Sequence, residues 1–253
     1  MILVADIHGA FDALAAVAAR GEPLLVLGDL LNIIDHRTHE GMLADVVGRD
    51  VVARLADLRS LGDRAAASAV WRQVTAGRED EIRSSMDALV DASYAAMAEA
   101  LRGAEAYVTY GNVDRPDRLA ASLPSGVRFV DGEVITVEGW RVGIAGGGVP
   151  GLGIPGEVGE DEMARKLESL GPVDVLCTHV APAVTQLSGD VIGGRPKHSG
   201  AILEYLERHR PRWHFFGDIH QPQATRWRVG GTTCINVGYF RATHRGVRHP
   251  PAP

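Results

Sequence analysis

The chain has 253 residues, of which 45% are hydrophobic and 23% are charged, and its mean hydropathy is close to zero. This balance excludes a disordered or collagenous chain and predicts one globular domain with a full hydrophobic core. The formal net charge of −6 argues against a broad nucleic-acid-binding surface, because binding to a phosphate backbone depends on clustered positive charge. A small anionic substrate, held by local positive charge, is still compatible with this composition.

The sequence shows no sign of a membrane or secreted protein. No apolar run approaches the roughly 18 residues that cross a bilayer, and Met1 to Ala5 enters a strand-like pattern without the charged region of a signal peptide. Cys177 and Cys234 are too few for a disulfide framework and do not form a CxxC pair. We therefore expect reduced thiols, a cytoplasmic location and no membrane partner.

The first part of the chain alternates short apolar runs with an Ala-rich segment. The runs at 2–5 and 24–27 predict buried strands, and residues 11–20 predict a helix between them. This alternation is typical of an α/β fold, in which the sheet is buried on both faces and functional groups gather in loops after the strands.

Residues 40–102 contain no proline and repeat apolar residues at helical spacing. They predict two or three helices, with breaks at 62–63 and 75–77. Because this stretch exceeds a simple crossover, we interpret it as a helical insertion within a single domain of residues 1–253. The insertion either caps the sheet or forms a contact between subunits, which would make a homo-oligomer.

The second half of the chain returns to strands and two further helices. Three apolar runs separated by Asp-Gly and Glu-Gly pairs predict an antiparallel meander, and a Gly-Gly pair predicts a hairpin near the end of the chain. Ser199 is the predicted N-cap of the last helix. The predicted strands are 106–110, 127–130, 133–137, 141–145, 173–177, 213–216, 226–229 and 232–235, and the predicted helices are 160–170 and 199–209.

Polar side chains that can bind a metal follow five of these strands. They are Asp6 and His8, Asp29, Asn112, His179, and Asp218 with His220. An Asp-x-His pair places two ligands from one loop on a single ion, and carboxylate, imidazole and amide ligands together suit Mn, Fe or Zn. Two such ions about 3.5 to 4 Å apart would generate a hydroxide and clamp a phosphoryl group.

In their order, these motifs resemble the calcineurin-like dinuclear metallophosphoesterase family, which carries DxH, GD, GN followed by H or a substitute and then D or E, a lone H, and GHxH. The matches span roughly residues 1–240: Asp6-Ile7-His8, Gly28-Asp29, Gly111-Asn112-Val113-Asp114, Thr178-His179 and Gly217-Asp218-Ile219-His220. The resemblance implies a four-layer α/β/β/α sandwich and two divalent ions. One ion would be held by Asp6, His8, Asp29 and His220, and the other by Asp29, Asn112, His179 and Asp218.

Two positions depart from the family pattern. Asp218 stands where the last motif usually has its first histidine, so the second ion would have three oxygen donors, which favours Mn over Zn. Asp218 either binds its metal directly, or reaches it through water, or leaves the second site weak. Val113 stands where many members have a histidine thought to protonate the leaving group. Because valine cannot transfer a proton, this favours diesters and good leaving groups. The loop histidines His36, His39 and His198 are alternative proton sources.

The resemblance therefore implies a metal-dependent phosphoesterase, with a phosphodiesterase preferred. A metal-bridging hydroxide would attack a small phosphodiester or nucleotide, with Asp29, Asn112 and His179 as catalytic residues. Arg115 and His198 are the candidate substrate contacts. The alternative is a catalytically weakened protein of the same fold that acts as a binding or scaffold module, which Asp218 and Val113 motivate.

Overall fold

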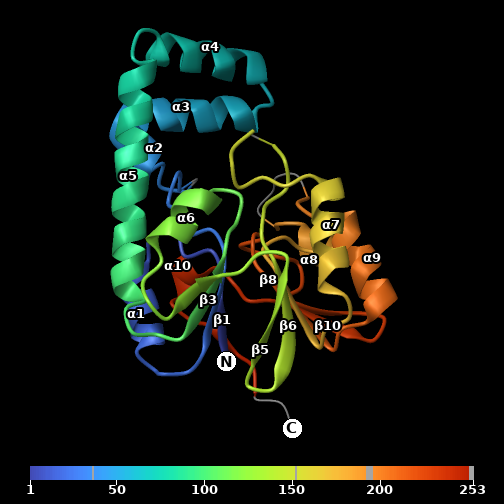
Figure 1. Ribbon diagram of the computed structural model, residues 1–253. Coiled ribbons are helices and arrows are strands. Elements are labelled where there is room, and N and C mark those ends of the chain that lie inside the picture. The colour runs from blue at the N-terminus through green and yellow to red at the C-terminus, as the bar shows by residue number, and fades with distance from the viewer. Residues whose placement is uncertain (36, 152, 192–195, 251–253) are drawn as a thin grey trace. The chain divides into compact units, whose positions relative to one another are not determined.

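The computed structural model describes residues 1–253 except 36, 152, 192–195 and 251–253. The chain divides into two compact units, one formed by Met1–Leu30 together with Ala96–Pro253, and the other by Leu31–Ala95. The larger unit contains two β-sheets and the helices that flank them (Figure 1). Among the described residues, no helix combines the length and the apolar character needed to cross a membrane.

The first sheet has the strand order β11-β1-β2-β3-β4. Its strands β1 to β4 are parallel to their neighbours, and the short β11 is antiparallel to β1. Every residue of β1 and β2 is buried, as their continuous apolar sequences predict. The elements of this part are β1 (Ile2–Val4), α1 (Phe11–Ala18), β2 (Leu24–Leu27), β3 (Ala106–Thr109), α6 (Pro116–Ser122), β4 (Val127–Phe129), α10 (Phe240–Thr243) and β11 (Val247–Arg248).

The second sheet has the strand order β5-β6-β7-β8-β10-β9. Its four central strands are parallel, and an antiparallel hairpin partner closes each edge. Helices α7 and α9 lie side by side along this sheet (Figure 1). The elements are β5 (Glu133–Val137), β6 (Trp140–Ala145), α7 (Glu160–Leu170), β7 (Val175–Thr178), α8 (Thr185–Ser188), α9 (Gly200–His209), β8 (Trp213–Phe216), β9 (Arg226–Val229) and β10 (Thr232–Asn236).

The hydrophobic core joins the two sheets. Leu3 and Leu27 of the first sheet belong to the same buried cluster as Val142, Val175 and Phe215 of the second. Burial of large aliphatic and aromatic side chains contributes roughly 1.5 to 3 kcal/mol each, so this shared core fixes one sheet against the other. The ends of β1, β2, β7 and β8 are thereby held in a defined relation, and all the predicted metal ligands except Asn112, which follows β3, follow these ends.

The predicted antiparallel meander is wrong in its first strand. β4 pairs in parallel with β3 in the first sheet, and only β5 and β6 form the antiparallel hairpin. The amide of Val130 donates to Val108 O, whereas the amide of Gly132 donates to Ile144 O, so the chain changes sheets at Asp131. An Asp-Gly pair specifies a tight change of direction but does not specify which strand becomes the neighbour.

The smaller unit is helical. It contains α2 (Met42–Val47), α3 (Arg49–Ser60), α4 (Arg64–Thr75) and most of α5 (Glu79–Ala100). The breaks fall at 61–63 and 76–78, within one residue of the predicted 62–63 and 75–77. Gly48, with φ of 93°, adds a break between α2 and α3 that the helical spacing did not predict. Leu55, Ala67 and Val70 form the core of this unit.

Candidate metal centre

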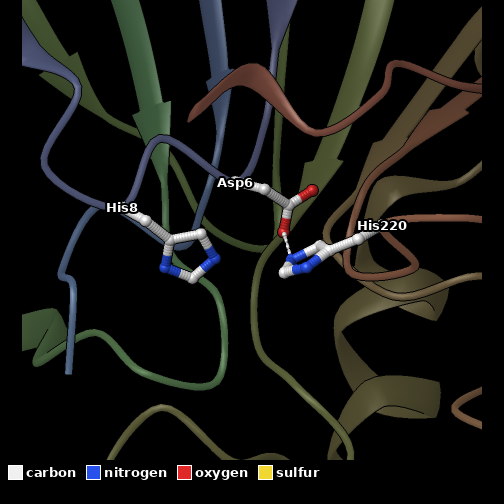
Figure 2. Close-up of side chains that lie close together, drawn as sticks. All are labelled: Asp6, His8 and His220. Carbon is white, nitrogen blue, oxygen red and sulfur yellow. Dashed lines mark ion pairs between the residues drawn. The ribbon is translucent and has the colours of Figure 1, made fainter. Parts of the chain in front are cut away.

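Four loops of the larger unit bring the predicted ligands together. Asp6 and His8 follow β1, Asp29 follows β2, and His179 and His220 follow β7 and β8. Ligand atoms of Asp6, His8 and His220 lie within 4.8 Å of one another, and so do those of Asp6, Asp29 and His179. Figure 2 shows the rings of His8 and His220 on either side of the Asp6 carboxylate. The structure therefore contains buried Asp and His groups that can hold a metal ion.

The distances between these ligand atoms suit shared ligation. His220 Nε2 is 3.5 Å from Asp6 Oδ1, His8 Nε2 is 3.7 Å from Asp29 Oδ2, and His179 Nε2 is 3.4 Å from Asp29 Oδ1. Two ligand atoms that each lie about 2.0 to 2.2 Å from one ion are separated by roughly 3 to 3.5 Å. The separations are also longer than those of good hydrogen bonds.

Several polar atoms in and beside this group are buried without a hydrogen-bond partner among the described residues. They are Asp6 Oδ1, Asn112 Oδ1, His179 Nε2 and Asp218 Oδ2. Leaving such groups buried and unsatisfied costs about 1 to 3 kcal/mol each, and a buried carboxylate needs a cation. A divalent ion bound by Asp6, His8 and His220 would satisfy Asp6 Oδ1, so the residues present fit a metal centre.

The backbone at the site is held in an uncommon conformation. Residues other than glycine rarely adopt a positive φ, which costs about 1 to 3 kcal/mol and persists where the surrounding structure enforces it. Four predicted ligands have such a φ: Asp6 (57°), His8 (42°), Asp29 (54°) and Asp218 (63°). This conformation at the strand ends is the local cause of the turn that directs these side chains toward one another.

Two glycines make the close approach of the loops possible. A Cβ on Gly28 would lie 2.3 Å from the backbone nitrogen of Gly111, and Gly28 itself has a φ of 95°. A Cβ on Gly111 would lie 2.1 Å from Asp29 Oδ1 and 2.6 Å from His179 Nε2. The glycines of the Gly-Asp and Gly-Asn motifs are therefore required by space, and that of the Gly-Asp motif also by conformation.

Hydrogen bonds behind the ligands fix their orientation. His179 Nδ1 lies 2.8 Å from Leu27 O, and because a carbonyl oxygen can only accept, Nδ1 is the donor and Nε2 is directed at the cluster. The fully buried Asp114 accepts from the amides of Asp29 (2.8 Å), Leu30 (3.0 Å) and Gly111 (2.9 Å). Asp114 thus ties the loop after β2 to the loop after β3.

The electrostatics of the site favour a cation. Burial would raise the pKa of Asp29, but the positive charges of His179 and His8 outweigh burial and hold that pKa well below its usual range. Burial would lower the pKa of His179, but the carboxylates, Asp29 first, raise it to about 10. Burial, together with the charge of Asp29, raises the pKa of Asp114 to about 7. In the absence of metal, a proton on His179 offsets part of the negative charge that a metal ion would otherwise neutralise.

The remaining predicted residues take different positions. Asn112 is half-buried with its Oδ1 shielded from solvent, and the neighbouring amide of Val113 donates to Asp29 Oδ1 at 3.1 Å. Arg115 is the half-buried N-cap residue of α6, and His198 is exposed. His39 belongs to the smaller unit, and His36 lies outside the described residues.

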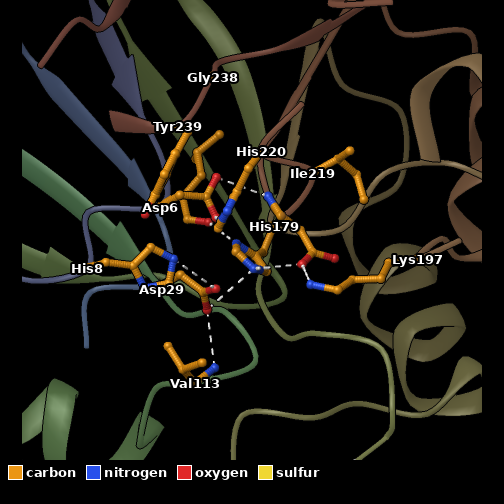
Figure 3. Close-up of polar contacts among 12 residues, drawn as sticks. Asp6, His8, Asp29, Val113, His179, Lys197, Ile219, His220, Gly238 and Tyr239 are labelled. Carbon is orange, nitrogen blue, oxygen red and sulfur yellow. Dashed lines mark hydrogen bonds and ion pairs between the residues drawn. The ribbon is translucent and has the colours of Figure 1, made fainter. Parts of the chain in front are cut away.

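Two residues at the site were missed by the sequence analysis. The ammonium group of Lys197 lies 2.5 Å from Asp218 Oδ1, and Figure 3 shows its side chain reaching toward His179. The ring of Tyr239 stacks on His220, with 3.9 Å between the ring centroids and 3° between the planes. The only sequence signal for Lys197 is that it is one of two lysines in the chain.

Comparison with known proteins bears on the fold. No protein-family model matches the chain, and no curated relative matches it either. The crystal structure of TT1561 of Thermus thermophilus aligns with 97% of this chain and 96% of its own, at 12% identity and a TM-score of 0.53. Another crystal structure aligns with 99% of this chain and 98% of its own, at 15% identity and a TM-score of 0.58. These likenesses show a shared α/β fold.

Proposed function

We propose that this protein is a metal-dependent phosphoesterase that acts on small phosphodiesters, with the four-layer sandwich fold of the metallophosphoesterase family. The observation that carries the proposal is the convergence of Asp6, His8, Asp29 and His220 from three strand ends, with three of these residues in a left-handed backbone conformation. Such strain is characteristic of functional sites.

Asp6, His8, Asp29 and His220 would hold a divalent ion, with Mn the first choice and Fe or Zn the alternatives. Their mixed carboxylate and imidazole ligands suit these borderline ions. When bound, such an ion would lower the pKa of a coordinated water and neutralise charge on the phosphoryl oxygens.

The residues of the chain position the reacting groups. Asp29 lies at the centre, because both His8 and His179 contact its carboxylate and the amide of Val113 donates to it. The bond from His179 Nδ1 to Leu27 O keeps Nε2 directed at the cluster. Asn112 would contribute its buried amide oxygen to the phosphoryl side of the site.

The side chain of Val113 determines the preferred substrate class. The backbone amide of Val113 donates to Asp29, so residue 113 is adjacent to the proposed centre. A valine side chain, however, cannot donate a proton to the departing oxygen of a substrate. A substrate with a good leaving group, or one whose leaving group is protonated by solvent, is therefore favoured. Small phosphodiesters and nucleotides with such leaving groups are the expected class.

The test is hydrolysis of bis(p-nitrophenyl) phosphate and p-nitrophenyl phosphate by metal-stripped protein to which Mn is returned. We expect Mn-dependent activity that favours the diester and is lost in Asp29→Ala. Val113→His should raise the rate for a monoester with an alkyl leaving group more than the rate for the aryl diester, because it supplies the missing proton donor.

Absence of hydrolysis of either substrate by the Mn-loaded protein would contradict the proposal. It would favour the alternative, in which the same fold serves as a binding or scaffold module.

A further inference from the structure

Lys197 is the cation that the metallophosphoesterase resemblance does not account for. Its side chain is 47% exposed, whereas that of its partner Asp218 is 1% exposed, so an accessible aliphatic stem delivers its ammonium group to a buried carboxylate. The backbone on both sides of the side chain is anchored. Lys197 N donates to Ser188 O at 3.1 Å, and Ser199 N donates to Ala181 O at 3.0 Å.

The ammonium group contacts the carboxylate oxygen that a second metal ion would need as a ligand. Asp218 Oδ1 is 4.0 Å from His179 Nε2, and this same oxygen is 2.5 Å from Lys197 Nζ. Among the described residues, two groups of Asp and His side chains have ligand atoms close enough to hold an ion. His179 belongs to one of these groups, and Asp218 belongs to neither. An ion that used both His179 Nε2 and Asp218 Oδ1 would be strongly repelled by the adjacent ammonium group.

The charges at the site support the same interpretation. Aspartate at position 218 adds one negative charge relative to the histidine that the family motif usually carries there, and Lys197 adds one positive charge beside it. The pair is therefore balanced without a metal ion. An ammonium group has three donors, of which Asp218 uses one, so the others can face an anionic substrate.

We propose that Lys197 takes the place of the second metal ion. The centre binds one divalent ion tightly, at Asp6, His8, Asp29 and His220, and the ammonium group of Lys197 supplies the second positive charge that holds a phosphoryl oxygen. Asp218 is then a positioning residue for Lys197. This inference rests on the proposed metal-dependent function, because it concerns how many ions the same site takes.

The test is the stoichiometry of Mn binding to metal-stripped protein, measured by isothermal titration calorimetry and by electron paramagnetic resonance. We expect one tight site, the spectrum of an isolated ion, and any second site at least about 100-fold weaker. The double variant Lys197→Met with Asp218→His should bind two ions tightly, and its spectrum should show two coupled ions that share Asp29.

Lys166→Met is the matched control, because Lys166 is the other lysine of the chain and its ammonium group contacts Tyr110 and Asp131. It should keep a stoichiometry of one. Two tight ions in the wild-type protein would overturn the role of Lys197 and leave the proposed function standing, and a double variant that folds but still binds one ion would also overturn it. No Mn binding to the wild-type protein would overturn both proposals.

Discussion

Gly111→Ala tests whether the packing of the loops after β2 and β3 sets the geometry of the proposed metal centre. The added Cβ would lie 2.1 Å from Asp29 Oδ1, whereas ordinary contacts begin near 3.4 Å, so the Asp29 carboxylate must withdraw by about 1.3 Å. The Cβ would also lie 2.6 Å from Nε2 and Cε1 of His179. Because the φ of Gly111 is not positive, the substitution acts through these contacts and not through backbone conformation.

The expected magnitudes follow from this displacement. If Asp29 binds the proposed metal ion, a shift of more than an ångström would remove it from ligation, and we expect Mn affinity to fall at least 100-fold, equivalent to about 2.7 kcal/mol. Overpacking should reduce the free energy of unfolding by a further 1 to 3 kcal/mol or so, and the midpoint of thermal unfolding by several degrees.

The measurements are calorimetric titration with Mn and thermal unfolding of the metal-stripped protein. Gly159→Ala is the matched control, because a Cβ there meets nothing within 4 Å, and the expected loss is confined to the N-cap of α7, roughly 0.5 to 1 kcal/mol, with Mn affinity unchanged. Wild-type Mn affinity in Gly111→Ala would show that close packing at residue 111 does not set the position of the Asp29 carboxylate.

Three further predictions follow from individual contacts. Asp114→Asn replaces an accepting oxygen with an NH₂ group that faces a backbone amide. Urea unfolding should therefore show that the free energy of unfolding falls by about 2 to 4 kcal/mol, and a fall of less than about 0.5 kcal/mol would contradict this prediction. Burial lowers the pKa of His214 to about 3 in the folded protein. As the pH falls below about 6.5, His214 therefore becomes protonated in the unfolded chain but not in the folded protein, and the folded state loses stability. Wild-type protein should lose about 2 kcal/mol more than His214→Gln between pH 7 and pH 5, and equal losses would count against this assignment. Mn at 100 times its dissociation constant should stabilise the metal-stripped protein by about 2.7 kcal/mol. This stabilisation should appear as a rise in unfolding temperature that a chelator reverses. An unchanged unfolding temperature would indicate that the folded state does not bind Mn.

The strand-end positions of the candidate metal ligands were predictable from two local signals. Buried apolar runs located the strands, and Asp6, Asp29 and His179 stand where those runs end. Since the carboxyl ends of parallel strands meet at one edge of a sheet, Asp6 and Asp29 converge within the first sheet, and His179 and His220 within the second. The hydrophobic core shared by the two sheets brings these two sets together, and the sequence signals do not contain that packing.

The contacts that were missed depend on the paths of loops. Lys197 is 21 residues from Asp218 and Tyr239 is 19 residues from His220, and neither spacing corresponds to a helix or strand period. The placement of β4 failed for a related reason, since the turn at Asp131 could lead to either sheet. In each case the tertiary position of the backbone decides the contact, and local propensity carries no information about it.

Crystals soaked in Mn and measured at the Mn absorption edge would test whether Asp6, His8, Asp29 and His220 bind a metal ion. We predict an anomalous peak bounded by Asp6, His8, Asp29 and His220, with the nearest ligand atoms at about 2.0 to 2.3 Å. Ordered Mn elsewhere on the protein, with no peak among these four side chains, would contradict it.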